Sequence, residues 1–191
     1  MATRGRGATG PDIDSPTEVQ DPLAIAMVEL RKAHFPNSEM FEMLSSVYRL
    51  QSMVQMRIEE ALRPFGVSLT SYFALTTLSI ASKGLRHREL ADYLKIHPTT
   101  VTLVVDALSR LSLVERRPYP NDRRVSLVVI TAEGIDLFER ASAALALGNF
   151  GFPDGILDVD RDSLLRLLAQ LRTALGDTVR DQTARTQDHS A

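Results

Sequence analysis

Residues 116–130 read RRPYPNDRRVSLVVI, and this stretch decides the fold. Asn121 and Asp122 form a charged turn between two runs of β-strand character. Arg116-Arg117 precede the turn, Arg123-Arg124 follow it, and the apolar run Val125–Ile130 continues from there. The pattern therefore predicts a two-stranded hairpin with a basic tip.

A helix-turn-helix pattern lies directly upstream of this hairpin. We expect helices at about 88–94 and 99–111, with Ala91 as the small residue where the two helices cross. Lys95 occupies a turn position where such motifs often carry glycine, so we expect a different turn geometry there. Pro98 suits the first turn of the second helix, because its missing N–H is not needed there. The expected apolar core positions are all apolar: Leu90, Leu94, Ile96, Val101 and Val104.

The outward face of the second helix is rich in threonine. A threonine hydroxyl can bond base edges or phosphates, and its methyl can meet the methyl group of thymine. For Thr99, a role as helix N-cap explains the residue as well as DNA contact does. No Arg, Asn or Gln follows in this helix before Arg110, so the helix is poorly suited to bidentate hydrogen bonds with bases. We therefore expect the hairpin to contribute more of the DNA contact.

The hairpin tip predicts contact with a polyanion. We expect the hairpin to bring its two arginine pairs together, and their repulsion is relieved by Asp122 or by DNA. In this interpretation Asp122 orients Arg124, Arg124 enters a minor groove, and Arg123 meets phosphate. The alternative is a surface salt bridge that ties the turn, worth ~0–1 kcal/mol. The predicted DNA-binding residues are His97, Pro98, Thr99, Thr100, Thr102, Arg116, Arg117, Asn121, Asp122, Arg123 and Arg124.

The charge of the chain is unevenly distributed. The formal net charge of the whole chain is −2. Residues 69–131 contain nine Lys or Arg and five acids, 9 − 5 = +4, whereas residues 132–191 contain six arginines and ten acids, 6 − 10 = −4. This asymmetry favours a basic nucleic-acid-binding module on an acidic scaffold, although ordinary surface mixing explains it about as well.

Two long apolar helices flank this module. One is predicted at about 39–63 and the other around Leu164–Leu175, and a helix at about 132–147 begins after the cap Thr131. The apolar faces of these two helices are larger than the small module can cover. This favours a fold in which the two helices pack on each other and on a partner subunit. We expect a mainly α fold with a small β-hairpin wing: a disordered tail (1–20), N-terminal dimerisation helices (21–66), a winged helix-turn-helix domain (67–131), C-terminal dimerisation helices (132–175) and a flexible tail (176–191).

Several other classes of protein find no support in the sequence. There is no Gly-rich phosphate loop, nucleophile elbow or histidine-pair zinc motif, so we expect no enzyme, no cofactor and no metal. The chain has no cysteine, and none of its four histidines stands at ligand spacing from another. It has no membrane-length apolar run and no signal-peptide apolar region in its first thirty residues, so we expect a cytoplasmic protein without a membrane partner.

Several short motifs resemble the MarR family of bacterial transcriptional regulators. The resemblance covers about Glu39 to Leu175 and implies a homodimer with one winged helix per subunit on a pseudo-palindromic operator. It places the wing arginine of the family at Arg124 and the supporting acid at Asp122, and it favours repression over activation. Ser112 departs from the pattern, which has glycine there, so we expect the recognition helix to end differently. The motifs are Glu89-Leu90-Ala91, Thr99–Thr102, Leu113–Arg116, Asp122-Arg123-Arg124 and Ile130–Gly134.

The resemblance also implies a small aromatic effector that releases DNA. Methionine and aromatic side chains suit a permissive pocket, although for each individual residue a place in the core or the dimer seam is the simpler explanation. A winged helix used only for protein–protein contact is the alternative function. The local positive charge and the bare arginine tip oppose it. The residues that would line the effector cleft are Met40, Phe41, Met43, Tyr48, Met53, Met56, Phe65, Tyr72 and Phe73.

Overall fold

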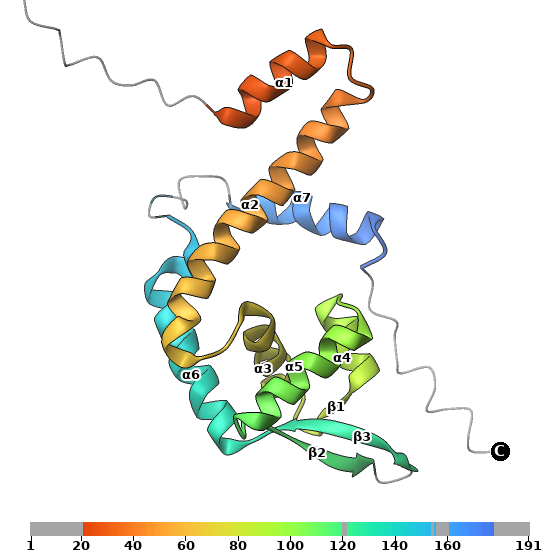
Figure 1. The fold of residues 1–191 in the computed structure, drawn as a ribbon, viewed down its shortest axis with the longest axis vertical. Helices are drawn as coiled ribbons and strands as arrows, with labels where there is room; N and C mark the ends of the chain where they lie inside the picture. Colours follow the sequence, from red (N-terminus) through yellow and green to blue (C-terminus); the bar gives the residue numbers. More distant parts are fainter. Residues whose placement is uncertain (1–20, 120–121, 154, 156–160, 178–191) are drawn as a thin grey trace, which may run out of the picture. The chain divides into compact units, whose positions relative to one another are not determined.

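The computed structural model describes residues 21–119, 122–153, 155 and 161–177, and for residues 122–125 it describes the backbone alone (Figure 1). The predicted tail 1–20 and all but two residues of the predicted tail 176–191 lie outside these ranges. The chain divides within its longest helix into two units, one ending at Met53 and the other beginning at Val54. The predicted domain boundaries stay predictions.

The first unit contains a helical hairpin. Helix α1 (Pro22–Lys32) begins at Asp21, whose carboxylate accepts a hydrogen bond from the Leu23 amide at 2.9 Å. Helix α2 (Ser38–Leu62) follows a short turn, across which Arg31 pairs with Glu42. The rings of Phe35 and Phe41 stand 5.0 Å apart between centroids on the same turn. The prediction of a continuous helix from about Glu39 to Arg63 is confirmed.

The second unit holds the hydrophobic core, which lies among its helices and against a small sheet. After the turn Arg63–Phe65, helices α3 (Leu69–Ile80), α4 (His87–Leu94) and α5 (Pro98–Arg110) bury one side each. Helices α6 (Ala132–Leu147) and α7 (Arg161–Ala174) complete the unit, with a 3-10 turn at Asn149–Gly151 between them. Every apolar position predicted for the helix-turn-helix lies in this core or packs against it. The fully buried side chains include Leu62, Leu75, Leu78, Leu90, Val101, Leu108, Val128 and Leu145.

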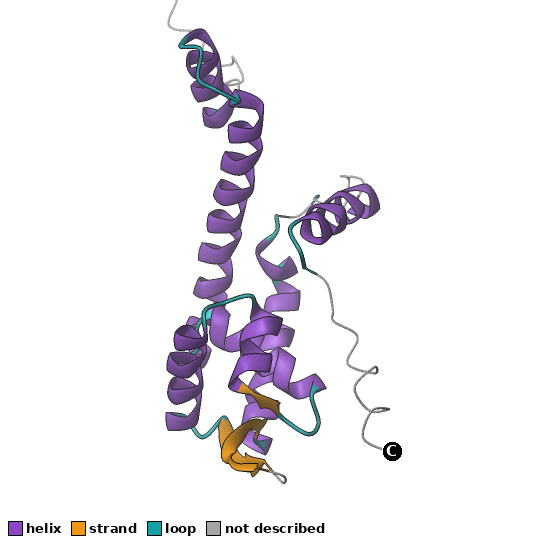
Figure 2. Ribbon diagram, turned by 90° about the vertical axis from the view of Figure 1, so that its right-hand side faces the viewer, coloured by secondary structure: helices purple, strands orange, loops and turns teal. Residues whose placement is uncertain are grey.

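The sheet has three strands where the sequence predicted two. The hairpin strands β2 (Val114–Tyr119) and β3 (Asp122–Ile130) are joined by β1 (Leu85–Arg86), in the order β1-β3-β2. Figure 2 shows the three strands gathered together at one edge of the helices. A glycine precedes β1 because a Cβ on Gly84 would stand 2.6 Å from the Val128 carbonyl oxygen, and its φ is +77°. A strand of two residues has no alternation that a sequence could reveal.

Both turns beside α5 keep the left-handed backbone that glycine favours. Lys95 ends α4 with φ +54°, and Ser112 follows α5 with φ +58°. The Leu113 amide donates to the Leu108 carbonyl at 3.0 Å and the Ser112 amide to Ser109 at 3.0 Å, the hydrogen-bond pair of a Schellman cap. The expectation that lysine and serine change these turns is therefore wrong. Both residues adopt the left-handed backbone, and each is sterically strained because, unlike glycine, it has a Cβ atom.

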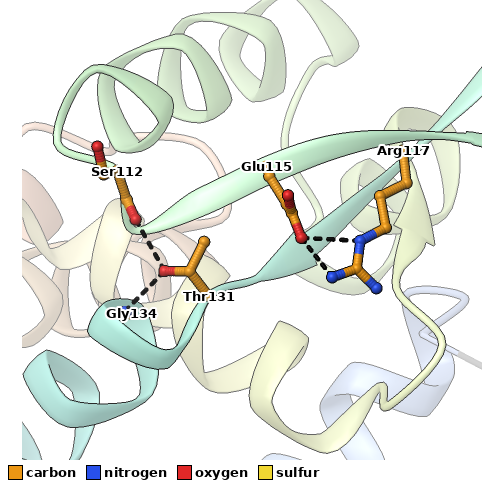
Figure 3. Close-up of polar contacts among 5 residues, drawn as sticks. All are labelled: Ser112, Glu115, Arg117, Thr131 and Gly134. Atoms are coloured by element: carbon orange, nitrogen blue, oxygen red, sulfur yellow. Dashed lines mark hydrogen bonds and ion pairs between the residues drawn. The ribbon is translucent and has the colours of Figure 1, made fainter.

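A threonine joins the end of α5, the strand β2 and the start of α6. The Thr131 hydroxyl donates to the Ser112 carbonyl at 2.8 Å and accepts from the Gly134 amide at 3.0 Å (Figure 3). The Thr131 amide also donates to the Leu113 carbonyl at 3.1 Å. A Cβ on Gly134 would stand only 2.1 Å from that same carbonyl oxygen. We call Ser112, Leu113, Thr131 and Gly134 the wing clamp.

The wing clamp leaves no room for a side chain on Gly134. Gly134→Ala should lower the free energy of unfolding by about 3 kcal/mol, because the backbone of Leu113 must move to admit the methyl group. Gly148→Ala is the control, since its nearest neighbour would lie 3.8 Å from the new Cβ. Urea unfolding of both variants checks this, and equal stabilities would contradict the close approach.

Candidate nucleic-acid interface

Helix α5 is held at its start by a histidine cap. His97 Nδ1 accepts a hydrogen bond from the Thr99 amide at 3.3 Å, and Pro98 occupies the first turn as predicted. His97 is therefore the cap, and Thr99 follows it inside the helix. Val101, Val105 and Leu108 are buried on one side. The other side exposes the predicted site residues Pro98, Thr99, Thr100 and Thr102, beside exposed His97 and Leu103.

Two of the three threonine hydroxyls on this face bond within the chain. Thr99 Oγ1 lies 3.0 Å from His97 Nδ1, which already accepts from the Thr99 amide, so this hydroxyl donates to the same nitrogen. The Thr102 hydroxyl donates to the Pro98 carbonyl at 3.2 Å. The exposed part of these two side chains is therefore enriched in methyl groups.

Both arginines of β2 are paired with acids of their own chain. Arg116 Nη2 lies 2.5 Å from Asp106 Oδ1 on α5. Figure 3 shows the second pair, in which Arg117 Nε donates to Glu115 Oε1 at 2.7 Å. These ion pairs are solvent-exposed, so each contributes ~0–1 kcal/mol and leaves its arginine able to exchange partners. Asp106 was not among the predicted site residues, although it fixes Arg116 against the helix.

The strand register places the arginines of β2 opposite the second half of β3. Arg116 faces Val128 and Arg117 faces Leu127 across the sheet, while Tyr119 faces Asp122. The register shifts between Pro118 and Tyr119, so residues 123–125 belong to the irregular end of the hairpin. The expectation that the hairpin brings the two arginine pairs together stays a prediction, because the side chains of Arg123 and Arg124 lie outside the described part of the structure. Within that part, Asp106 and Glu115 pair with the arginines of β2.

The tip of the wing lies partly outside the described residues. Asn121 is not described, and the side chains of Asp122, Arg123 and Arg124 are not described either. Their backbone forms the first residues of β3. The separate roles predicted for these three side chains therefore stay predictions.

A histidine sits at the junction of α4, α5 and β2. Burial lowers the pKa of His87 below its ordinary value, and the charge of Arg116 lowers it further, while Asp106 opposes both. The nearby Glu89 instead serves α4: it accepts from the Arg86 amide at 2.8 Å and from Arg86 Nε at 2.9 Å. Burial alone would raise the pKa of Glu89, but the hydrogen bonds and charge of Arg86 outweigh it, so the pKa lies below its ordinary value.

The lowered pKa of His87 makes stability depend on pH. Below about pH 6.5 the unfolded chain takes up the proton at this residue more readily than the folded chain, so acidification favours unfolding. Comparing urea midpoints at about pH 7.5 and about pH 5.5, His87→Gln should lose less stability than the wild type. An equal loss in both proteins would show that His87 contributes nothing to this dependence.

A shallow pocket of about 240 Å³ opens beside the wing. It contains none of the methionines and aromatic residues predicted to line an effector cleft. Most of those residues are exposed, including Met40, Met56 and Phe73, whereas Tyr72 is buried, with its hydroxyl 2.9 Å from the Ser142 hydroxyl. The pocket is lined by Lys83, Gly84, Leu85, Arg86, Glu89, Tyr93, Tyr119 and Leu127.

Comparison with known proteins agrees with this geometry. The family model described as MarR family matches residues 67–126, which run from the start of the winged helix into β3. The HTH-type transcriptional regulator YhbI of Bacillus subtilis is 28% identical over 151 residues, which span 79% of this chain and 95% of YhbI. The chain belongs to the MarR family. It is accordingly a transcriptional regulator, as its relatives are.

Solved structures of the family share the fold. Sco5413, a MarR family transcriptional regulator from Streptomyces coelicolor, superposes with a TM-score of 0.65 at 29% identity, covering 74% of this chain and 99% of Sco5413. CouR from Rhodococcus jostii, solved with p-coumaroyl-CoA, gives a TM-score of 0.61 at 25% identity, covering 74% of this chain and 95% of CouR. The mainly helical fold with a small antiparallel sheet, predicted from the sequence, is confirmed.

Among the described residues there is neither a cluster of metal-binding side chains nor a helix that could span a membrane. No three His, Asp or Glu side chains within the described ranges come together as a metal site. In the same part of the chain, no helix is both long and apolar enough to cross a bilayer.

Proposed function

We propose that this MarR-family regulator is a homodimer that binds a pseudo-palindromic operator and represses transcription by occluding a promoter. The observation that carries the proposal is the exposed start of α5, a helix whose Asp106 pairs with Arg116 of β2, in a module of net charge +4. Two copies of α5 enter successive major grooves about 10 bp apart, and the wings enter the flanking minor grooves. The proposed location of the protein is the cytoplasm, where it is associated with the nucleoid when it is bound to DNA.

CouR supports both binding and repression. A further solved structure describes CouR as a transcriptional repressor bound to a 23-mer DNA duplex, and it shares the fold of this chain with a TM-score of 0.58 at 23% identity. In this chain we assign phosphate contact to Arg116, Arg117 and Arg123 and minor-groove insertion to Arg124. The groove-facing helix residues are His97, Pro98, Thr99, Thr100 and Thr102, and the tip is completed by Asn121 and Asp122.

The exposed apolar faces of α2 and α7 support a homodimer. Leu164, Leu165 and Leu167 of α7 are each more than two-fifths exposed in the single chain. Met40, Leu44 and Val47 are likewise exposed on the first half of α2. Contiguous apolar surface of this kind indicates a partner subunit rather than contact with water.

A small aromatic effector is the proposed regulatory ligand. The support comes from the methionines and aromatics of α2 and α3 and from CouR, which was solved with p-coumaroyl-CoA. Binding of such a ligand between the dimer helices and the winged helix would change the spacing of the two copies of α5.

Removing the wing arginine tests the DNA-binding proposal. Arg124→Ala should weaken operator binding by at least tenfold, because a cation in an electronegative minor groove is lost. It should also reduce the slope of log K against log salt by about one. Fluorescence anisotropy across a salt series measures both quantities.

Arg140→Ala is the matched control for this experiment. Arg140 carries the same charge on α6, where its guanidinium pairs with Asp136 at 2.9 Å. It should leave the affinity and the salt slope unchanged. If Arg124→Ala bound as tightly as the wild type, the wing would have no part in binding, and the protein–protein alternative would gain.

Placing a charge on α7 tests the homodimer. Size-exclusion chromatography with light scattering should give the wild type twice the 21.2 kDa mass of one chain. Leu165→Glu should give the mass of one chain, because a carboxylate cannot be buried unpaired in an apolar seam. Tyr93→Glu, which charges an exposed residue of α4, should remain a dimer. A wild type of single-chain mass would refute the dimer.

A further inference from the structure

Leu103 is an exposed leucine on the helix that the proposed function places in the major groove. Its side chain is 66% exposed, one turn beyond Thr99 on the same face of α5. The core does not account for this side chain, because Val101, Val104 and Val105 fill the buried side of the helix. An exposed leucine at this position therefore needs an explanation other than core packing, and the neighbouring side chains on the same face provide one.

Those surroundings offer little hydrogen bonding to a base. From His97 to Ser109 the helix contains no Arg, Lys, Asn, Gln or Glu. The hydroxyls of Thr99 and Thr102 bond to His97 Nδ1 and to the Pro98 carbonyl. The one carboxylate of the helix, Asp106, pairs with Arg116. The exposed face next to Leu103 therefore presents an isobutyl group and threonine methyls, and the Thr100 hydroxyl and the His97 ring are the polar groups beside them.

The major groove contains one apolar group that this face fits. Among the base edges in the major groove, only thymine presents a methyl group, at its C5 position. The surrounding module supplies the attraction for DNA through its net charge of +4, with Lys95 at the turn before α5 and the arginines of β2 beside it. Charge complementarity thus selects duplex DNA, rather than a protein, as the occupant.

We propose that Leu103 is a specificity-determining residue that contacts thymine C5-methyl groups. The methyls of Thr99 and Thr102 complete the contact, so each half-site of the operator carries thymine at a fixed position. This inference rests on the proposed function and deepens it. Affinity comes from the wing and the phosphates, whereas sequence is read through methyl groups rather than through bidentate hydrogen bonds.

The test removes the methyl group from the DNA. Duplexes are first selected from a random library with the wild-type protein, and the strongest is remade with deoxyuridine in place of one thymidine at a time. At the fixed position this change should weaken binding by about fourfold, the effect of one buried methyl. Leu103→Ala should lose most of the preference for thymidine over deoxyuridine, because only the threonine methyls remain, and anisotropy at constant salt measures this.

Two further variants separate shape from chemistry. Leu111→Ala removes a leucine that is 51% exposed at the end of α5 and should keep the full sensitivity to deoxyuridine. Leu103→Asn keeps the branched shape but replaces both methyls with an amide, which pairs with adenine through N6 and N7. Repeating the selection with Leu103→Asn should therefore shift the preferred base at that position from thymine to adenine.

The outcomes distinguish this inference from the proposed function. A wild type that selects no duplex would overturn both. A wild type that selects a sequence but binds deoxyuridine equally well at every position would overturn the methyl contact alone. Sensitivity retained in Leu103→Ala would overturn the assignment to this residue. Because Leu103 is exposed, its variants should melt like the wild type.

Discussion

Thr131 joins three elements of the winged helix through its hydroxyl and its amide. The hydroxyl donates to the carbonyl that follows α5 and accepts from the third residue of α6, while the Thr131 amide bonds to Leu113. The end of α5, the root of the wing and the start of α6 are thus tied to one residue.

The wing clamp also explains a motif that the sequence offered only as a resemblance. Ile-Thr-x-x-Gly follows the wing because threonine must cap α6 and because a Cβ at Gly134 would collide with the Leu113 carbonyl. At Ser112 the family glycine is replaced, yet the backbone stays left-handed. Two hydrogen bonds of the Schellman cap and the bond from Thr131 hold the serine in place.

The periodic parts of the fold could be read from the sequence, and the non-periodic parts could not. The stripe of α2, the cap Thr131 and the apolar sites of the helix-turn-helix follow from local rules and were predicted. Strand β1 was missed because two residues have no period. The prediction for the turn at Lys95 was wrong, because the packing of α4 on α5 overrode the conformational preference of a single residue.

The candidate site shows the same division. The exposure of the threonines follows from helical periodicity, which fixes which side of α5 faces the core. The pairing of Arg116 with Asp106 links residues ten positions apart on different elements, so no local rule finds it. The register shift at Pro118 is likewise a property of the folded hairpin. Both features are set by tertiary structure, so local sequence rules do not reveal that the arginines of β2 are paired within the chain.

The central claim is that α5 reads DNA through methyl groups while the wing supplies electrostatic affinity. A crystal structure of the protein with its selected duplex tests this most directly. The account predicts α5 in the major groove, a Leu103 methyl within about 4 Å of a thymine C5-methyl, and Arg124 in the adjacent minor groove. A complex in which α5 faces away from the bases, or in which Leu103 faces solvent, would contradict it.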